Sequence, residues 1–535
     1  MNSEQLLELT AQISTLNSML VSLQKDSEKM CKENERLREE YESLKNDYKN
    51  LKEENDYLKR KLFGRSSEKS AVLNVGQLSL FDEAEMECDP ELKEEITYQR
   101  AKRKRQKEDI KAKLDQLPQI DINYTLEDEH QICPSCGSRL KKVGKKLIRR
   151  ELNYIPAKLE VHNIYQTTYE CRTCKKGNKP YMYNAPIDAP VIPHSYATSE
   201  SVAQVMVDKY VNCMPLYRQE QEWKRLGFQL SRATMANWII IASNEWLTPI
   251  KERMHELLLE ENYTHADESP VQVLNETGRK NTTKSYMWVY ATIKESKHPI
   301  RIFDYTPTRA GYNPKRFLNG FKGYVITDGY QAYETLDSIV NVFCWAHARR
   351  KFSEAIISGT KNVDETIAGK ALNKIKELFV IKREIETLKP EEKREMRQKR
   401  AKPLVEEFFS WCDKNQKAVL TGSKTYKALQ YALKHREGLS EYLEDGLLPM
   451  TNSLDERTIR LFAVGRKNWL FSTSTEGAQA SATVYSIIQT AKANGLDPYK
   501  YLTYIFKYLP GHDIKEQANV DHFLPWNKHI QEECK

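Results

Sequence analysis

His265-Ala-Asp-Glu-Ser-Pro270 follows a short, mostly uncharged run and ends in a Ser-Pro turn signal. Further along the chain, Tyr324-Val-Ile-Thr-Asp-Gly329 repeats this arrangement, a strand-like run that leads into a single aspartate. The two runs predict two short strands, which end at Asp267 and at Asp328. Because a strand places its side chains rigidly, these aspartates are candidates for a shared site.

The segment after residue 258 alternates between strand-like and helical text. Three strands, a helix, and then strand, helix and strand is the order of a ribonuclease-H-like sheet, in which acidic residues of the first and fourth strands meet. We therefore expect a ribonuclease-H-like α/β catalytic domain over residues 258–510, with an all-helical insertion at about 361–446. The expected strands are 263–267, 285–292, 300–304, 323–328 and 341–345, and the expected helices fall around 313–320 and 330–337.

A third carboxylate, Glu456, lies in the helical stretch from Asn452 to Arg460. Two Mg²⁺ ions can stabilise the attacking and the leaving oxygen of a phosphodiester, and carboxylates are the hard ligands that hold them. We expect Asp267, Asp328 and Glu456 to be the catalytic, metal-binding residues, supported by Asn452 and Arg460 one turn either side of Glu456. Each acid alone is weak support, because Asp328 could be a turn residue and Glu456 could form a surface pair with Arg460.

The segment Cys344-Trp-Ala-His-Ala-Arg-Arg-Lys-Phe352 follows the fifth expected strand. We expect His347 to orient a phosphate or a metal-bound water, and Arg349 and Arg350 to contact the DNA backbone. The alternatives are a zinc site, for which no second pair lies nearby, and a packed core cysteine beside a satisfied histidine.

Four of the ten cysteines form two Cys-x-x-Cys pairs. This spacing lets two thiolates grip one tetrahedral ion, so two pairs complete a structural Zn²⁺ site without an open position for catalysis. The gap between the pairs is longer than in a usual zinc ribbon and contains strand-like text, which a larger hairpin would accommodate. The expected ligands, in a module over residues 116–185, are Cys133, Cys136, Cys171 and Cys174.

Apolar residues recur with a heptad period over residues 6–62, with charged residues between them, which predicts a coiled coil and self-association. Asn34 and Asn55 occupy one seam and would set its register. The alternative is one long amphipathic helix packed on the protein itself. The second seam is made by Leu9, Leu16, Leu23, Met30, Leu37, Leu44, Leu51 and Leu58.

Two further segments are candidates for DNA contact. The basic run from Arg100 to Lys113 fits either a phosphate-contacting arm or a solvated helix face. Residues 186–257 read as helices with a glycine turn at Gly227 and a helix capped by Ser231, which resembles a helix-turn-helix. In that arrangement Arg232 and Asn237 would face a DNA groove, although ordinary helical packing explains the pattern nearly as well.

The composition suits a soluble, multidomain protein, with 40% hydrophobic residues and a net charge of +8 that permits a polyanionic partner. No apolar run approaches a membrane span, and the polar, acidic N-terminus does not resemble a signal peptide. Within the insertion we expect a basic hinge from Lys389 to Pro403. The remaining expected divisions are a coiled coil at 1–64, a linker with the basic run at 65–115 and a short, helix-poor C-terminal tail at 511–535.

Several motifs together resemble the large transposase of the "IS sixty-six" group of bacterial insertion sequences, and the resemblance covers nearly the whole chain. Ser269 stands where threonine is commoner in that group, and Ser453 where a second asparagine is usual. Besides His265–Pro270, the four cysteines and Cys344–Phe352, the matching motifs are Leu62-Phe-Gly-Arg-Ser-Ser-Glu-Lys69, Leu78-Ser-Leu-Phe-Asp-Glu83, Ile192-Pro-His-Ser-Tyr-Ala197, Val325-Ile-Thr-Asp-Gly-Tyr-Gln-Ala-Tyr333, Asn452-Ser-Leu-Asp-Glu-Arg457 and Gly465-Arg-Lys-Asn-Trp-Leu-Phe471.

The resemblance implies a DDE transposase that binds terminal inverted repeats, nicks the element's ends with Mg²⁺ or Mn²⁺ and joins the freed 3′-hydroxyls to target DNA. Its triad would be Asp267, Asp328 and Glu456, and Arg466 and Lys467 are further candidates for DNA contact. It also implies two small accessory proteins and a cytoplasmic, nucleoid-associated location in a bacterium. Two rival functions are a non-catalytic, zinc-containing DNA-binding regulator and a ribonuclease-H-like, structure-specific nuclease without strand transfer.

Overall fold

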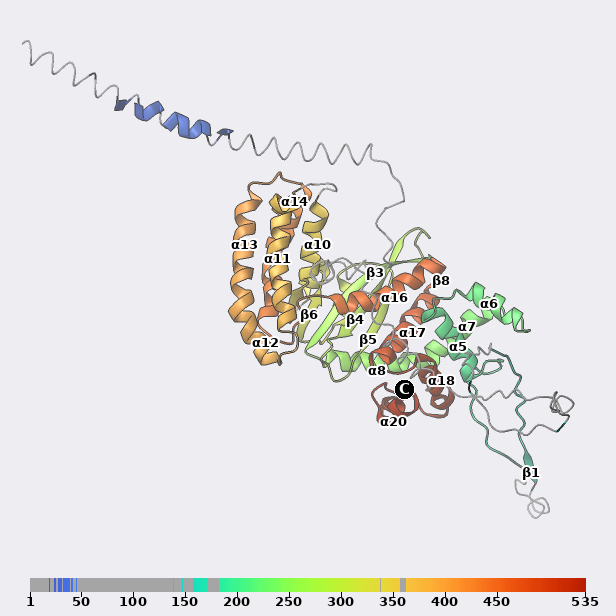
Figure 1. Cartoon of the computed structure of the whole chain (residues 1–535). Helices are drawn as coiled ribbons and strands as arrows, with labels where there is room; N and C mark the ends of the chain where they lie inside the picture. The colour runs from blue at the N-terminus through green and yellow to red at the C-terminus, as the bar shows by residue number, and fades with distance from the viewer. Residues whose placement is uncertain are drawn as a thin grey trace, which may run out of the picture.

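The computed structural model describes residues 157–170, 182–336, 338–356 and 362–535, with parts of 19–45 and residues 138 and 147 (Figure 1). For residues 183, 335 and 453–457 it describes the backbone only. Most of the expected heptad, the linker with its basic run, and Cys133, Cys136, Cys171 and Cys174 lie outside the described residues. Among the helices that the structure describes, none is long and apolar enough to cross a bilayer.

The described positions between residues 19 and 45 are all helical and exposed (blue in Figure 1). Met30 and Leu37, which belong to one expected apolar seam, are 67% and 50% exposed in the single chain. A coiled coil buries exposed apolar seam residues of this kind against a second helix.

A mixed sheet has the strand order β5-β4-β3-β6-β7, and a short strand, β8, pairs with the far end of β3. β3, β4 and β5 are antiparallel, whereas β6 and β7 run parallel to β3. The fold is therefore mixed α+β, with three antiparallel strands followed by two parallel ones. The strands are β3 (Tyr263–Asn275), β4 (Lys284–Thr292), β5 (Arg301–Thr306), β6 (Gly323–Thr327), β7 (Ile339–Phe343) and β8 (Ser472–Ser474).

β3 is longer than its sequence suggests, and the expected strand end at Asp267 is wrong. The strand continues through Ser269 and Pro270, which pair with Met287 and Tyr286 of β4. Proline lacks an N–H and is tolerated in a strand where no neighbour needs that donor. β3 pairs with β6 only over Tyr263–His265 and with β8 only from Val273 onward, so this edge of β3 is open at the proline.

Helices cover both faces of the sheet (Figure 1). On one face, Phe303 of β5 lies 5.4 Å from Tyr485 of α17, between ring centroids. On the other face, Tyr290 of β4 stacks on Phe317 of α9 at 3.7 Å. The covering elements are α16 (Ser453–Trp469) and α17 (Thr475–Ala493) on the first face, and α8 (Thr248–Leu259), α9 (Tyr312–Phe317) and a 3₁₀ turn, η4 (Gln331–Thr335), on the second.

α17 also closes the edge of the sheet. The backbone N–H groups of Arg301 and Phe303 in β5 donate to Thr490 Oγ1 at 3.0 Å and to Ser486 Oγ at 2.8 Å. An uncovered edge strand would be a template for aggregation, and here helix hydroxyls satisfy it.

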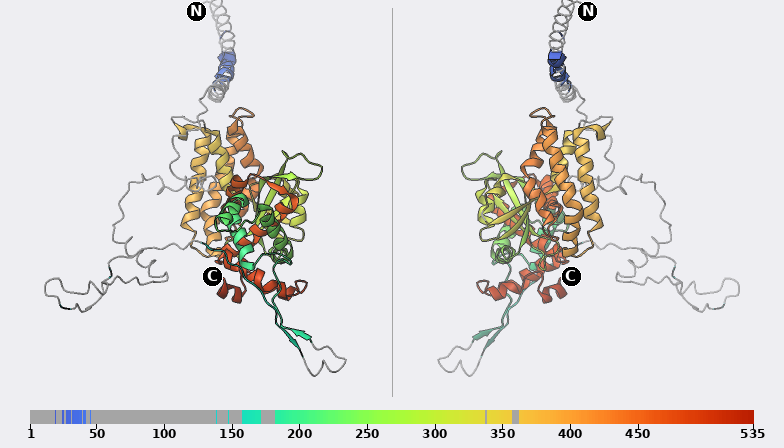
Figure 2. Two further views of the ribbon diagram at one scale, coloured as in Figure 1. Left: turned by 90° about the vertical axis from the view of Figure 1, so that its right-hand side faces the viewer. Right: turned by 90° about the vertical axis from the view of Figure 1, so that its left-hand side faces the viewer.

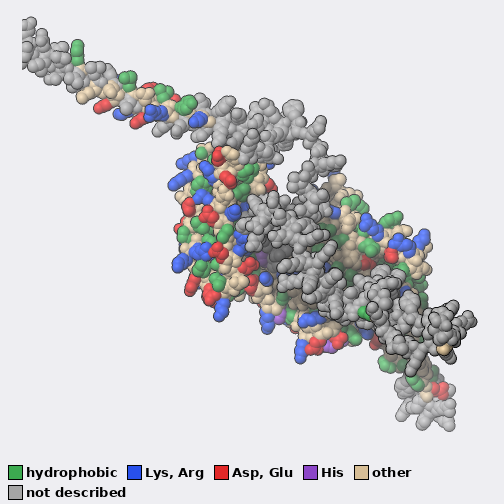
Figure 3. All heavy atoms as spheres, viewed as in Figure 1, with side chains coloured by type: hydrophobic (Ala, Val, Ile, Leu, Met, Phe, Trp, Pro, Cys, Tyr) green, Lys and Arg blue, Asp and Glu red, His purple; other side chains and the backbone are tan. Residues whose placement is uncertain are grey.

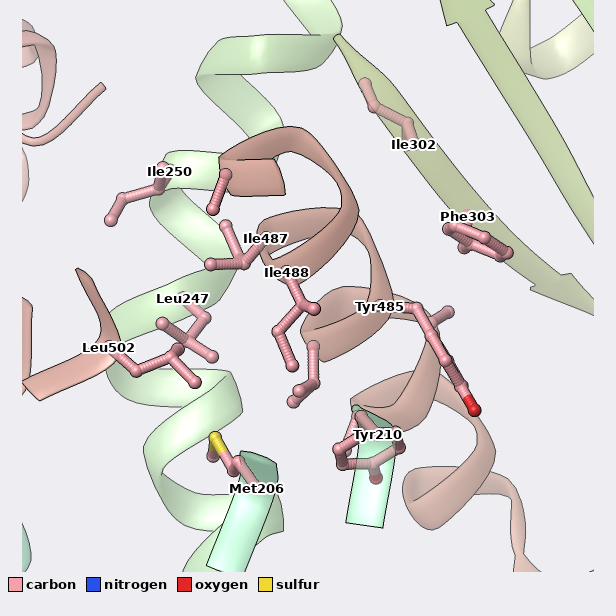
Figure 4. Close-up of a cluster of buried hydrophobic side chains, with 14 of the residues drawn as sticks. Met206, Tyr210, Leu247, Ile250, Ile302, Phe303, Tyr485, Ile487, Ile488 and Leu502 are labelled. Atoms are coloured by element: carbon pink, nitrogen blue, oxygen red, sulfur yellow. The ribbon is translucent and has the colours of Figure 1, made fainter. Parts of the chain in front are cut away.

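The helices before and after the sheet share one hydrophobic core with it, and Figure 4 shows Met206, Leu247, Ile487 and Leu502 grouped there, with Ile302 on the neighbouring strand β5. The expectation of a helix-poor tail is wrong, because apolar residues near the C-terminus bury themselves in this core as short helices. The contributing helices are α5 (Ser199–Tyr210), α6 (Leu216–Arg225), α7 (Arg232–Ala242), α18 (Pro498–Tyr508), α19 (Gln517–Asp521) and α20 (Lys528–Glu533).

Between β7 and α16 the elements are all helical, and they form a bundle beside β6 and β7 with its own core (Figure 2). The expected basic hinge is wrong, because Pro390–Gln416 is one helical run with a π-helical turn at Arg397–Ala401. Arg397 holds this turn, since its buried guanidinium donates to the carbonyls of Tyr442 and Leu448. The helices are α10 (Trp345–Ala355), α11 (Ile367–Glu384), α12 (Pro390–Met396), α13 (Lys402–Gln416), α14 (Lys424–Lys434) and α15 (Arg436–Ser440).

Candidate active site

Asp267 and Asp328 belong to neighbouring parallel strands. β3 and β6 pair in the register Tyr263↔Tyr324, Thr264↔Val325 and His265↔Ile326. Continuing this register by two residues brings Asp267 level with Asp328, just past the end of β6. Because side chains alternate along a strand, Asp267 falls on the sheet face that carries His265, and Asp328 directly follows the last residue of β6.

Local hydrogen bonds orient both carboxylates. Asp267 Oδ1 accepts from the backbone N–H of Glu268 at 2.7 Å, and Asp328 Oδ1 accepts from that of Tyr330 at 2.9 Å. The chain turns sharply after Asp328 because Gly329 has a φ of +85°. A β-carbon would make this conformation unfavourable, so the glycine permits the turn that presents Asp328.

Asn452 connects the helix that carries Glu456 to β3. Its Oδ1 lies 2.6 Å from His265 Nδ1, and its Nδ2 donates to the carbonyl of Ala266 at 3.4 Å. Its backbone N–H donates to Cys344 Sγ at 3.1 Å, at the start of α10. Asn452 precedes α16 and is fully buried. Its side chain forms hydrogen bonds to the sheet instead of capping its own helix.

α16 is attached to β3 at a second position. Arg466, in the last turn of the helix, donates to Ser269 Oγ at 3.1 Å and also to the carbonyl of Pro270. Glu456 lies in the first turns of α16, between these two attachments, and its side chain is outside the description. Arg460, half-buried, lies one turn further along. The backbone of Glu456 is thus held over the strand of Asp267.

His347, on α10, has its pKa lowered to about 4 by burial and by the positive charge of Arg350, against the opposing charge of Asp328. It is therefore a neutral imidazole at neutral pH, able to accept a hydrogen bond or bind a metal ion. Arg349 is buried, which does not support the expected contact with a DNA backbone, whereas Arg350 is half-buried.

Sequence reasoning missed Glu268. Its side chain is 2% exposed, accepts from Arg309 Nε at 2.7 Å and from the Tyr333 hydroxyl at 3.2 Å, and lies on the opposite face from Asp267. Burial and the charge of Asp328 raise its pKa to about 6, opposed by Arg309. The adjacent aspartate and glutamate in the sequence were the available signal. Only the alternation of side chains along the strand places Asp267 and Glu268 on opposite faces of the sheet.

The two DNA-facing candidates in the helical region are both exposed. Ser231 caps α7 by accepting from the N–H of Thr234, as expected. Arg232, at the start of α7, has its guanidinium 5.9 Å from the Tyr217 ring of α6, and Asn237 lies further along α7. Of the other basic candidates, Lys467 is exposed, while Arg466 is engaged with β3.

Comparison with known proteins identifies the family. The model described as "Transposase IS66 family" matches residues 194–480, which include both aspartates, Glu456 and the helical insertion. The chain belongs to this transposase family. Other models of the same family match residues 130–175 (zinc-finger binding domain of transposase IS66), 486–526 (IS66 C-terminal element) and 50–122 (Transposase C of IS166 homeodomain). The zinc-finger match spans all four paired cysteines and supports Zn²⁺ and DNA binding.

Relatives of this transposase family member occur in Sinorhizobium fredii (strain NBRC 101917 / NGR234). Uncharacterized protein y4jD is 28% identical over 493 residues, which cover 88% of this chain and 93% of that protein. Uncharacterized protein y4qI is 30% identical over 416 residues, which cover 75% of this chain and 74% of that protein. The likeness to y4jD thus extends over almost the full length of both proteins.

Proposed function

We propose that this family member is an active DDE transposase with a ribonuclease-H-like catalytic domain. It binds the terminal inverted repeats of its insertion sequence, cleaves at the element's ends and joins the 3′-hydroxyls to target DNA. The observation that supports this proposal best is the level register of Asp267 and Asp328 beside a helix that carries Glu456. Carboxylates from separate elements can hold the divalent ions that stabilise the attacking and leaving oxygens in phosphoryl transfer.

The donor set fits a hard divalent cation. Asp267 and Asp328 offer carboxylate oxygens from neighbouring parallel strands, and burial keeps His347 neutral near Asp328. Among the described side chains no group of three or more His, Cys, Asp or Glu is close enough to hold one ion, so the third ligand in this proposal is Glu456. Mg²⁺ or Mn²⁺, when bound, supplies charge stabilisation to the attacking and leaving oxygens.

The protein's own residues set the geometry in this proposal. Asn452 and Arg466 hold α16 against β3, so the helix that carries Glu456 is fixed beside the strand of Asp267. Self-association through the N-terminal heptad would bring two active sites to two element ends. Two small accessory proteins and a nucleoid location remain expectations from the family resemblance.

DNA is bound in this proposal by the zinc module and by α7 through Arg232 and Asn237. The insertion is a less specific candidate surface, because its Lys and Arg side chains alternate with Asp and Glu in the view of Figure 3. A surface that carries both signs of charge favours weak contacts with the DNA backbone over strong, salt-dependent binding.

Cleavage and joining assays test the proposal. Full-length protein is incubated with labelled element ends and supercoiled target DNA over a Mg²⁺ or Mn²⁺ titration. Asp267→Asn, Asp328→Asn and Glu456→Gln are expected to abolish both steps and to keep DNA binding. Asp413→Asn, at an exposed carboxylate of the insertion, is the matched control and should remain active.

Each other outcome selects a different function. Full activity in Glu456→Gln would remove that residue from the site. If the wild-type protein binds the element's ends but does not nick them in the presence of the metal, the result would favour the DNA-binding regulator. Nicking of branched DNA without joining would favour the structure-specific nuclease.

A further inference from the structure

The helical insertion touches the candidate active site at the turn that follows β6. The hydroxyl of Tyr431, in α14, donates to the backbone carbonyl of Asp328 over 2.5 Å. The two residues are 103 positions apart in the chain, so the contact is purely tertiary. It acts on the backbone of the residue whose carboxylate we assign to the metal site.

The close approach extends to the next residue. A β-carbon at Gly329 would lie 3.1 Å from the Tyr431 hydroxyl oxygen and 3.3 Å from His435 Nε2. Both distances are tighter than ordinary van der Waals contact. The turn and the end of α14 are therefore fitted to each other, and a larger residue at position 329 would push them apart.

The end of α14 is itself anchored to the sheet. The His435 ring lies 4.6 Å from those of Tyr431 and of Phe343, the last residue of β7. Lys434 forms an ion pair of 3.1 Å with Glu334 in the 3₁₀ turn η4.

We propose that Tyr431 is a positioning residue for Asp328, through which the helical insertion sets the affinity of the active site for its divalent metal. This inference rests on the proposed function, because it takes Asp328 as a metal ligand. A hydrogen bond to the backbone fixes the peptide that carries the carboxylate, and a loosened carboxylate binds a cation less well. The insertion is then a structural part of the active site as well as a candidate DNA surface.

The test compares Tyr431→Phe with Tyr426→Phe in the full-length, zinc-loaded protein. Tyr426 lies on the same helix, and its hydroxyl accepts only a local hydrogen bond from Gln430 at 3.0 Å. We measure Mn²⁺ affinity by calorimetry without DNA, and the Mn²⁺ concentration for half-maximal end cleavage. Tyr431→Phe is expected to weaken both by about threefold to tenfold, the equivalent of one hydrogen bond, whereas Tyr426→Phe changes neither.

A second readout is independent of activity. Hydrogen exchange at the Gly329 and Tyr330 amides, which donate to Thr327 Oγ1 and Asp328 Oδ1, should be faster in Tyr431→Phe than in Tyr426→Phe. Equal exchange and equal Mn²⁺ affinity in the two variants would overturn the inference. A lowered melting temperature with unchanged Mn²⁺ affinity would also overturn it, because it would show a structural role alone.

Asp328→Asn separates this inference from the proposed function. If Asp328→Asn abolishes cleavage and Tyr431→Phe behaves like Tyr426→Phe, the transposase proposal stands and the positioning role fails. If Asp328→Asn leaves both metal affinity and cleavage intact, the metal site is elsewhere and both proposals fail.

Discussion

His265 donates from Nδ1 to Asn452 Oδ1 over 2.6 Å, inside the protein, and this bond joins the strand of Asp267 to the helix of Glu456. The direction follows from the asparagine, whose Nδ2 faces the carbonyl of Ala266 and whose Oδ1 therefore accepts. The geometry of the candidate site consequently depends on a buried polar contact between residues that are 187 positions apart.

Asn452→Ala should destabilise the fold and impair cleavage. The substitution leaves His265 Nδ1 and the Ala266 carbonyl without their partner in a buried place, which costs roughly 1–3 kcal/mol. Denaturant unfolding measures the loss. Asn468→Ala is the control, because Asn468 lies on the exposed side of α16 and donates to Cys213, and it should cost under about 0.5 kcal/mol. Equal losses in the two variants would contradict the role given to Asn452.

The pH dependence of the free energy of unfolding should reveal the protonation of His265. Burial lowers its pKa to about 4, below the unfolded value of about 6.5, so the unfolded chain binds more protons between these values. Its contribution to stability is therefore complete above pH 6.5 and is lost as the pH falls toward 4. Between pH 7 and pH 5 the loss should be roughly 2 kcal/mol.

The measurement is the free energy of unfolding at pH 7 and pH 5 for wild-type protein, for His265→Gln and for the exposed control His512→Gln. His265→Gln should lose less stability over this interval than the other two proteins. The pKa of Glu268 is raised to about 6, so its titration changes the stability in the opposite direction to that of His265. Glu268 is present in all three proteins, so its contribution cancels in the comparison. An identical pH dependence in His265→Gln and wild type would show that His265 does not titrate as expected.

Arg309→Met should destabilise the protein in a pH-dependent way. Its guanidinium pairs with the Glu268 carboxylate and is half-exposed, so its loss should cost roughly 1–3 kcal/mol, less than for a fully buried pair. Without the cation the pKa of Glu268 should rise further above 6, so the cost should be largest at pH 8 and shrink toward pH 5. Arg316→Met, at an exposed ion pair with Asp304, serves as the control and should show a small, pH-independent change.

The zinc prediction concerns the paired cysteines. Purified protein should contain about one Zn²⁺ per chain by elemental analysis, since four thiolates complete one closed site. Cys136→Ser should lower the zinc content and weaken DNA binding. Cys213→Ser, at a half-buried free cysteine, should keep its zinc. Full zinc content in Cys136→Ser would place the ion elsewhere.

Local patterns in the sequence predicted much of the sheet. The strand-like runs at 285–292 and 323–328 differ by one residue at most from β4 and β6, because apolar and β-branched runs report on local burial. The Ser231 cap was predictable for the same reason. β3 was cut short because Ser-Pro is a turn signal in most contexts, and only its pairing with β4 keeps Pro270 in the strand.

By itself the sequence determined the local patterns from which the candidate residues were chosen: aspartates that follow strand-like runs, a glutamate in a helical stretch, paired cysteines and a heptad. These are short-range patterns, and their spacing reflects local backbone geometry. Only the tertiary structure decided that Asp267 stands level with Asp328, that Asn452 attaches α16 to β3, and that Tyr431 of the insertion holds the Asp328 turn. Strand register and helix docking depend on packing between distant segments, and a local pattern carries no information about such contacts.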